Sequence, residues 1–229
     1  MQKVTVNELV DFSRGSDRSK KSLAHRLKTR IPKEKKELEK DDSGGNYWMP
    51  STSCIINVFK QEDKELYNLK IEALHTKLKS DIIPRTKVMR QKNIDILSNF
   101  RDFELSDLKP PHIMKYEKVQ KQFTIIKVNG FPLYINPSIV FSFSENDKLK
   151  IGAIWFIPKK NGFHRNEIGM FCEMLQRFLV ENYADDFQIS QDYCSVVDTF
   201  KAQKVVYTEL SEGIIPSLIN KTLNEINEL

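Results

Sequence analysis

The chain has 229 residues, of which 40 % are hydrophobic and 29 % are charged, and its net charge is +5. These proportions are ordinary for a soluble globular protein with one sizeable core. A transmembrane helix is excluded because no run of eighteen or more apolar residues occurs, and no apolar secretory signal is expected at the N-terminus.

Residues 1–45 are expected to form a basic helical arm followed by a linker. Thr5 and Glu8 have the spacing of a capping box, so a short helix is predicted from there to Gly15. A second helix is predicted over residues 18–28. Its surface and its end are basic and contain Arg18, Lys20, Lys21, Arg26, Lys28 and Arg30. Two short helices around a glycine turn fit either a DNA-reading helix-turn-helix or a plain helical hairpin.

Charge is distributed unevenly along the chain. Residues 14–36 contain ten Lys or Arg and two acidic residues, a local net charge of +8. Residues 161–229 contain five basic and eleven acidic residues, a local net charge of −6. A basic N-terminal part predicts an anionic partner, and the alternative is an ordinary solvated helix surface.

Residues 46–110 are predicted to be a helical region that packs on the core. The charged stretch before it, up to Gly45, has the composition of a linker or loop. Apolar residues at helical spacing predict two helices, over residues 62–79 and 85–100. Pro110 and Pro111 then end the helical part of the chain.

Residues 111–229 are predicted to form the core domain, which begins with a hairpin. Two apolar runs, 123–128 and 131–135, flank Asn129-Gly130. Both turn residues tolerate a positive φ, so this dipeptide between two apolar runs is a strong hairpin signal.

Further strands are predicted over residues 139–143 and 149–157, and the second is apolar on both faces, as is typical of a central strand. A helical period then predicts a helix over residues 166–183. Two strands near 193–200 and 204–210 and a helix over 213–228 complete the chain. This order predicts an α+β fold in which helices cover a mixed β-sheet.

Few residues match a recognised chemical motif. The sequence contains no phosphate-binding loop, dinucleotide fingerprint, metalloprotease motif or EF-hand loop, and its four histidines are isolated. The three cysteines, Cys54, Cys172 and Cys194, are far apart and odd in number, which fits neither a disulfide scaffold nor a zinc site. A reducing compartment, with the cytoplasm as the default, is therefore expected.

Short segments spread over most of the chain carry a family resemblance. They are VTVNELVDF at residues 4–12, YWMP at 47–50, LYINPSIVF at 133–141, IGAIW at 151–155 and CSVVDTF at 194–200. Together they look like a family of uncharacterised bacterial proteins, which in turn resembles the PD-(D/E)XK nuclease-like fold. The resemblance implies a hairpin with acidic and acid-x-lysine positions, a covering helix, and a setting in bacterial defence or mobile elements.

Nucleases of this fold use two carboxylates to hold Mg²⁺, which clamps the scissile phosphate and acidifies a water, while a lysine positions that water. This sequence departs from that pattern at Ser138, Ala153 and Trp155, so the catalytic site is expected to be degenerate. If activity remains, its candidates are Asp198, Glu145, Asp147 and Lys159, and Mg²⁺ would be the cofactor. Otherwise no cofactor is expected.

The leading hypothesis is a non-enzymatic nucleic-acid-binding component. Besides the basic residues of the second helix, the candidate contacts to DNA or RNA are Lys148, Lys150, Lys159 and Lys160 near strand ends. One alternative is a divergent metal-dependent nuclease. The other is a protein-interaction module that docks a basic partner through its acidic C-terminal half.

Overall fold

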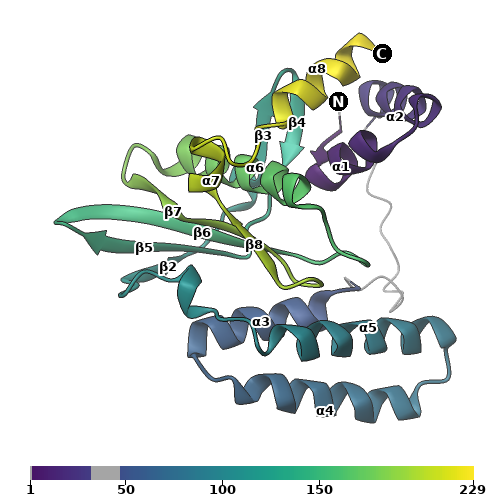
Figure 1. Ribbon diagram of the computed structural model, residues 1–229, viewed down its shortest axis with the longest axis vertical. Coiled ribbons are helices and arrows are strands. Elements are labelled where there is room, and N and C mark those ends of the chain that lie inside the picture. The colour runs from purple at the N-terminus through teal and green to yellow at the C-terminus, as the bar shows by residue number, and fades with distance from the viewer. Residues whose placement is uncertain (1, 32–46) are drawn as a thin grey trace.

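The computed structural model describes residues 2–31 and 47–229 and confirms the predicted α+β class (Figure 1). Helices cover both faces of a five-stranded mixed sheet, and a three-stranded sheet packs with the N-terminal helices. The predicted linker, residues 32–45, lies outside the described residues. None of the described helices is both long and apolar enough to cross a membrane.

The large sheet has the strand order β2-β5-β6-β7-β8. Its strands are β2 (Lys115–Glu117), β5 (Ile139–Glu145), β6 (Lys148–Ile157), β7 (Gln188–Asp198) and β8 (Gln203–Val206). Strand β6 pairs antiparallel with β5 and parallel with β7, which confirms its predicted central position. Residues of β6 are buried on both faces because each face is covered by helices.

The predicted long helix is confirmed as α6 (Arg165–Tyr183), which covers one face of the sheet (Figure 1). Ala153 and Val196 of the sheet belong to the same apolar cluster as the buried side chains of α6. The opposite face presents Ile139, Phe141 and Phe143 of β5 to the helical layer.

The helical layer consists of α3 (Met49–Gln61), α4 (Glu65–Ser80) and α5 (Pro84–Phe100). Helices α4 and α5 were predicted, whereas α3 was not. Glu62 separates α3 from α4: it has a φ of 60°, and its N–H donates to the Val58 carbonyl at 2.8 Å. This left-handed residue ends one helix just before the next begins, so the predicted start at residue 62 lies at a boundary.

The polar side chain of Asn93 fixes α3 to α5. Its Oδ1 accepts a hydrogen bond of 2.9 Å from the Ser51 N–H, and its Nδ2 donates to the carbonyls of Tyr47 and Met89, each at 2.9 Å. We expect Asn93→Ala to lower the free energy of unfolding by about 2 to 3 kcal/mol, since it leaves a buried N–H without an acceptor. Urea unfolding measures this, and Asn99→Ala at an exposed site of α5 is the control. Equal losses in both variants would contradict the expectation.

The N-terminal segment is built into the core. Strand β1 (Val4–Thr5), which was not predicted, pairs parallel with β4 (Phe131–Tyr134). The predicted capping box is confirmed: the Thr5 N–H donates to Glu8 Oε2 at 2.9 Å, and the Glu8 N–H donates to Thr5 Oγ1 at 3.3 Å. It starts α1 (Val6–Arg14), whose four buried apolar residues join the cluster under α6, and α2 (Asp17–Thr29) follows.

The predicted hairpin at Asn129-Gly130 is confirmed. Strand β3 (Ile125–Val128) pairs antiparallel with β4, and the turn residues have φ values of 48° and 84°. These two positive φ values match a type I′ turn. The chain before β3 forms a short 3₁₀ turn, η2 (Lys121–Thr124), in place of the first part of the predicted strand, and another, η1 (Ser106–Leu108), follows α5.

The C-terminal predictions need three corrections, and the first is that β7 begins at Gln188 and not near residue 193. The predicted strand over 204–210 ends at Val206, because the Glu209 carboxylate accepts the Val206 N–H at 3.0 Å and starts α7 (Tyr207–Ser211). The predicted helix over 213–228 begins only at α8 (Ile219–Glu228). The buried Glu173 of α6 accepts the N–H groups of Leu218 and Ile219, at 3.0 and 3.1 Å, and so fixes where α8 starts.

Candidate functional site

Asp198, a catalytic candidate, lies at the end of β7 and is completely buried. Its Oδ2 accepts the Phe163 N–H at 2.7 Å, and its Oδ1 accepts the N–H groups of Phe200 and Lys201 at 2.9 and 3.4 Å. The Lys201 ammonium donates to the Phe163 carbonyl at 2.9 Å. A Cβ at Gly162 would lie 2.4 Å from Oδ2. The carboxylate therefore joins the β6–α6 loop tightly to the turn after β7.

Burial raises the pKa of Asp198, and the hydrogen bonds from the backbone N–H groups of Phe163, Phe200 and Lys201 oppose that rise. These bonds use most of the acceptor capacity of the two carboxylate oxygens. The arrangement is that of a structural carboxylate which neutralises backbone donors at a loop junction.

Glu145 and Asp147 lie at the opposite end of the sheet. Glu145 pairs with Lys148 at the β5–β6 turn, whereas Asp198 lies beside Ile157 at the far end of β6. Strand β6 spans ten residues, so these ends are about 30 Å apart at roughly 3.3 Å per residue. An ion shared between Asp198 and either acid is incompatible with this fold. Within residues 2–31 and 47–229, no three His, Cys, Asp or Glu side chains group as a metal site.

The predicted strand-end lysines fall into two separate groups. Lys148 and Lys150 belong to the β5–β6 end, where Lys150 forms an ion pair with Glu145. Lys159 and Lys160 follow the other end of β6, where Lys159 forms an ion pair of 2.8 Å with Asp11 of α1. These lysines therefore do not form one continuous surface.

The basic helix and the acidic C-terminal part of the chain meet each other. Lys20 of α2 forms an ion pair of 2.6 Å with Glu225 of α8, and the Lys28 ammonium donates to the Asn227 carbonyl at 3.4 Å. Arg30 forms an ion pair with Glu8 at 2.7 Å. Some of the acidic charge considered for docking a basic partner is thus used within the molecule.

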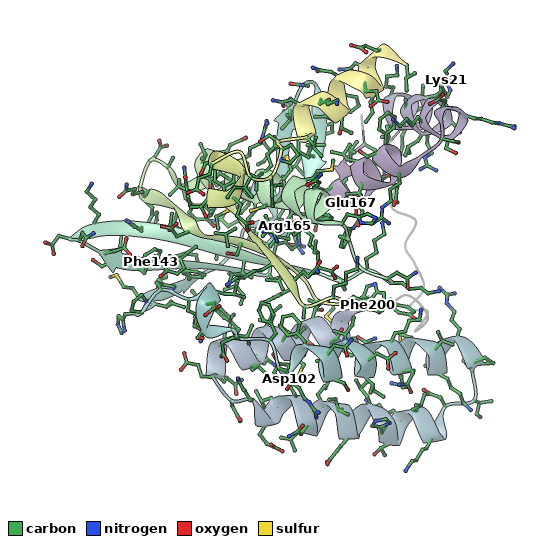
Figure 2. All side chains as sticks on the ribbon, viewed as in Figure 1. Lys21, Asp102, Phe143, Arg165, Glu167 and Phe200 are labelled. Atoms are coloured by element: carbon green, nitrogen blue, oxygen red, sulfur yellow. The ribbon has the colours of Figure 1, made fainter. Side chains whose placement is uncertain are left out.

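Three of the predicted cations of α2 remain exposed: Arg18, Lys21 and Arg26. They form no ion pair with another described residue. Lys21 points away from the rest of the molecule (Figure 2). The outer side of α2 is therefore a basic surface with free charges.

A second basic surface, at the end of the α4–α5 hairpin, was missed by the sequence reasoning. Residues 76–92 contain six Lys or Arg and one Asp, a local net charge of +5, which equals the net charge of the whole chain. None of the residues 75–92 is buried. Both helices extend past the end of α3 (Figure 1). We call residues 75–92 the hairpin end; the local charge count was the signal that could have identified it.

Lys160 of the β6–α6 loop adds to this surface. Its ammonium lies close to that of Lys92, on α5, and Asp95 is the acid that acts on Lys92 in the opposite direction. Partial desolvation, and then the neighbouring charge of Lys160, lower the pKa of Lys92. Two cations facing each other repel, and an anion bound between them would remove that repulsion.

A surface depression of about 420 Å³ lies between the end of α5 and the β7–β8 turn. Its cations are engaged, since Arg165 forms an ion pair with Glu209, and Lys204 forms one of 3.1 Å with Asp107. This depression has mixed charge and no unpaired nucleophile or base, so it is a weaker candidate than the hairpin end.

The fold and its surfaces define an α+β protein with two basic helical projections and, among the described residues, no group of three potential metal ligands. No family model matches the chain, and neither the curated proteins nor the solved structures contain a significant match.

Proposed function

We propose that this protein is a non-enzymatic component that binds nucleic acid, DNA or RNA, through the hairpin end and Lys160, with the outer side of α2 as a second contact. The observation that carries the proposal is that residues 75–92 contain no buried residue yet hold a charge equal to that of the entire chain. Lysine and arginine brought against phosphates release condensed counterions, which gives sequence-independent affinity.

The positions of the cations on α5 favour a role in binding an anion and not in stabilising the helix. The first turn of α5 has no acidic residue and contains Arg85 and Lys87. Cations near a helix N-terminus face the positive end of the helix dipole and destabilise the helix. Their position is therefore poor for folding and well suited to an external polyanion.

The positions where the resembled nucleases carry catalytic groups are used for packing in this chain. Ser138 Oγ accepts the Phe156 N–H at 3.0 Å, and Trp155 packs edge-on against Phe171 with ring centroids 5.3 Å apart. Ala153 is completely buried. These packing contacts support the part of the proposal that places no metal site at these three positions.

The proposal predicts a salt-sensitive affinity that depends on the hairpin end. Fluorescence anisotropy with labelled duplex DNA, from about 50 to 200 mM salt, should show log K falling linearly with log salt. Replacing both Lys87 and Lys92 with glutamine should reduce the magnitude of that slope by about 2, because each lost phosphate contact removes about 0.9.

Lys148→Gln is the matched control, since it removes an exposed lysine at the opposite end of β6. It should leave the slope unchanged. Absence of binding by the wild-type protein to DNA or RNA at about 50 mM salt would reject the proposal, because phosphate contacts are strongest there. Cleavage of the probe after addition of Mg²⁺ would instead favour the nuclease alternative.

A further inference from the structure

The apex of the α4–α5 hairpin is apolar. Ile82 and Ile83 are 92 % and 63 % exposed, and Val88, on the α5 side of the apex, is 52 % exposed. Single exposed apolar residues are common, but an adjacent isoleucine pair at the tip of a projection is not explained by packing. In the figure the apex lies at the far end of α4 and α5 from the sheet (Figure 1).

Local bonds also connect the apex to α4 and α5. Arg90 of α5 forms an ion pair with Asp81 through two nitrogen atoms, and the Asp81 N–H donates to the Lys77 carbonyl at 3.0 Å. The N–H groups of Thr86 and Lys87 both donate to the Ile83 carbonyl, at 3.1 and 3.2 Å. These bonds hold the backbone around the two isoleucines in place, which reduces the conformational entropy lost on binding.

We propose that Ile82 and Ile83 form a wedge that inserts between adjacent bases of duplex nucleic acid, while the flanking cations hold its phosphates. This inference rests on the proposed function and specifies duplex nucleic acid as the ligand. Isoleucine, leucine, methionine and proline are the side chains that such proteins insert into base steps. Lys79 and Arg85 lie three residues before Ile82 and two residues after Ile83, one on each side of the pair.

The distribution of charge favours a nucleic acid over an anionic membrane. From Arg85 to Lys92 the cations extend along α5 over about 10 Å, at 1.5 Å per residue, and continue to Lys160 on the body of the molecule. A membrane-inserting apex would gather its cations in one plane and add interfacial Trp or Tyr. Residues 75–92 contain no Trp, Tyr or Phe.

A wedge acts most easily on a base step that is already weakened, because unstacking a paired step costs a few kcal/mol. We therefore expect the wild-type protein to bind a duplex with a central mismatch about tenfold more tightly than the fully paired duplex. A 2-aminopurine beside the mismatch should become brighter on binding, since its fluorescence rises when it unstacks.

The double variant Ile82→Ser/Ile83→Ser should bind both duplexes with the wild-type salt slope but lose the mismatch preference and the fluorescence increase. Both side chains are exposed, so circular dichroism should remain unchanged. Ile214→Ser is the control, because Ile214 is 64 % exposed in the loop before α8.

If the double variant keeps the preference and the fluorescence increase, the wedge is wrong and the phosphate-binding proposal stands. If the wild-type protein binds neither duplex, the wedge is wrong, and the proposed function fails as well only if single-stranded DNA and RNA probes are also not bound. Binding to vesicles with about 30 % anionic lipid that requires Ile82 and Ile83, without binding to DNA or RNA, would overturn the inference in favour of a membrane.

Discussion

Replacing Asp198 with alanine is expected to lower the free energy of unfolding by about 3 to 5 kcal/mol, one of the two largest single-residue effects we foresee in this chain. The backbone N–H groups of Phe163 and Phe200 would lose a charged acceptor at 2.7 and 2.9 Å. Each hydrogen bond to a charged group contributes about 1.5 to 3 kcal/mol. Chemical denaturation followed by circular dichroism measures the loss.

Asp192→Ala is the matched control, because Asp192 is an exposed residue of the same strand. It should change the stability by less than about 0.5 kcal/mol. A small effect at Asp198 would contradict its structural role. A wild-type melting temperature that rises with Mg²⁺, with no rise in the Asp198→Ala variant, would instead identify Asp198 as a metal ligand.

The pH dependence gives a separate test of Asp198. Burial raises its pKa in the folded protein above the ordinary value of 3.8. A raised folded pKa means that the folded state binds the proton more tightly, so the contribution of this group is complete below pH 3.8 and is lost as the pH rises through the folded pKa. The stability of the wild type relative to that of Asp198→Asn should therefore be highest in acid and decrease as the pH rises over that window.

Replacing Gly152 with alanine is expected to lower the free energy of unfolding by about 3 kcal/mol. A Cβ at this position in β6 would lie 2.7 Å from the Tyr193 carbonyl oxygen and 2.9 Å from the ring of Phe141. The pairing between β6 and β7 shifts register between Ile151 and Ala153, so this glycine marks a close backbone approach. Strand backbone cannot move away as a flexible side chain could.

Gly15→Ala is the control for Gly152. A Cβ at Gly15 would have contacts no shorter than 3.3 Å, and the φ of Gly15 is −71°, which any residue adopts. This change should stay within about 1 kcal/mol of the wild type. Comparable losses at both glycines would show that the close approach at β6 and β7 relaxes easily.

The sequence alone determined those elements whose signals lie within a few residues. Asn129-Gly130 predicted the β3–β4 turn because both positions require positive φ, and they adopt it. The apolar run of β6 predicted a central strand, and the helical period after it predicted α6. Periodicity along the chain reports directly which faces become buried.

The boundaries that the sequence reasoning misplaced have two kinds of cause. The start of α7 depends on a local bond from the Val206 N–H to Glu209, which the sequence reasoning overlooked. The start of α8 depends on a tertiary contact, because Glu173 accepts its first N–H groups from a different helix. Residue spacing does not reveal a carboxylate that arrives from about 45 residues away. Strand β1 also depends on a tertiary contact, since its two residues form a strand only by pairing with β4.

The charge runs were visible in the sequence, but their use was decided by the fold. Lys20 and Glu225 neutralise each other across α2 and α8, whereas Lys92 and Lys160 are brought together with like charge. In the sequence, the isoleucine pair at residues 82–83 resembles an ordinary connection between two helices. It became an exposed apex only because α4 and α5 continue beyond the end of α3, where no other element covers them among the described residues.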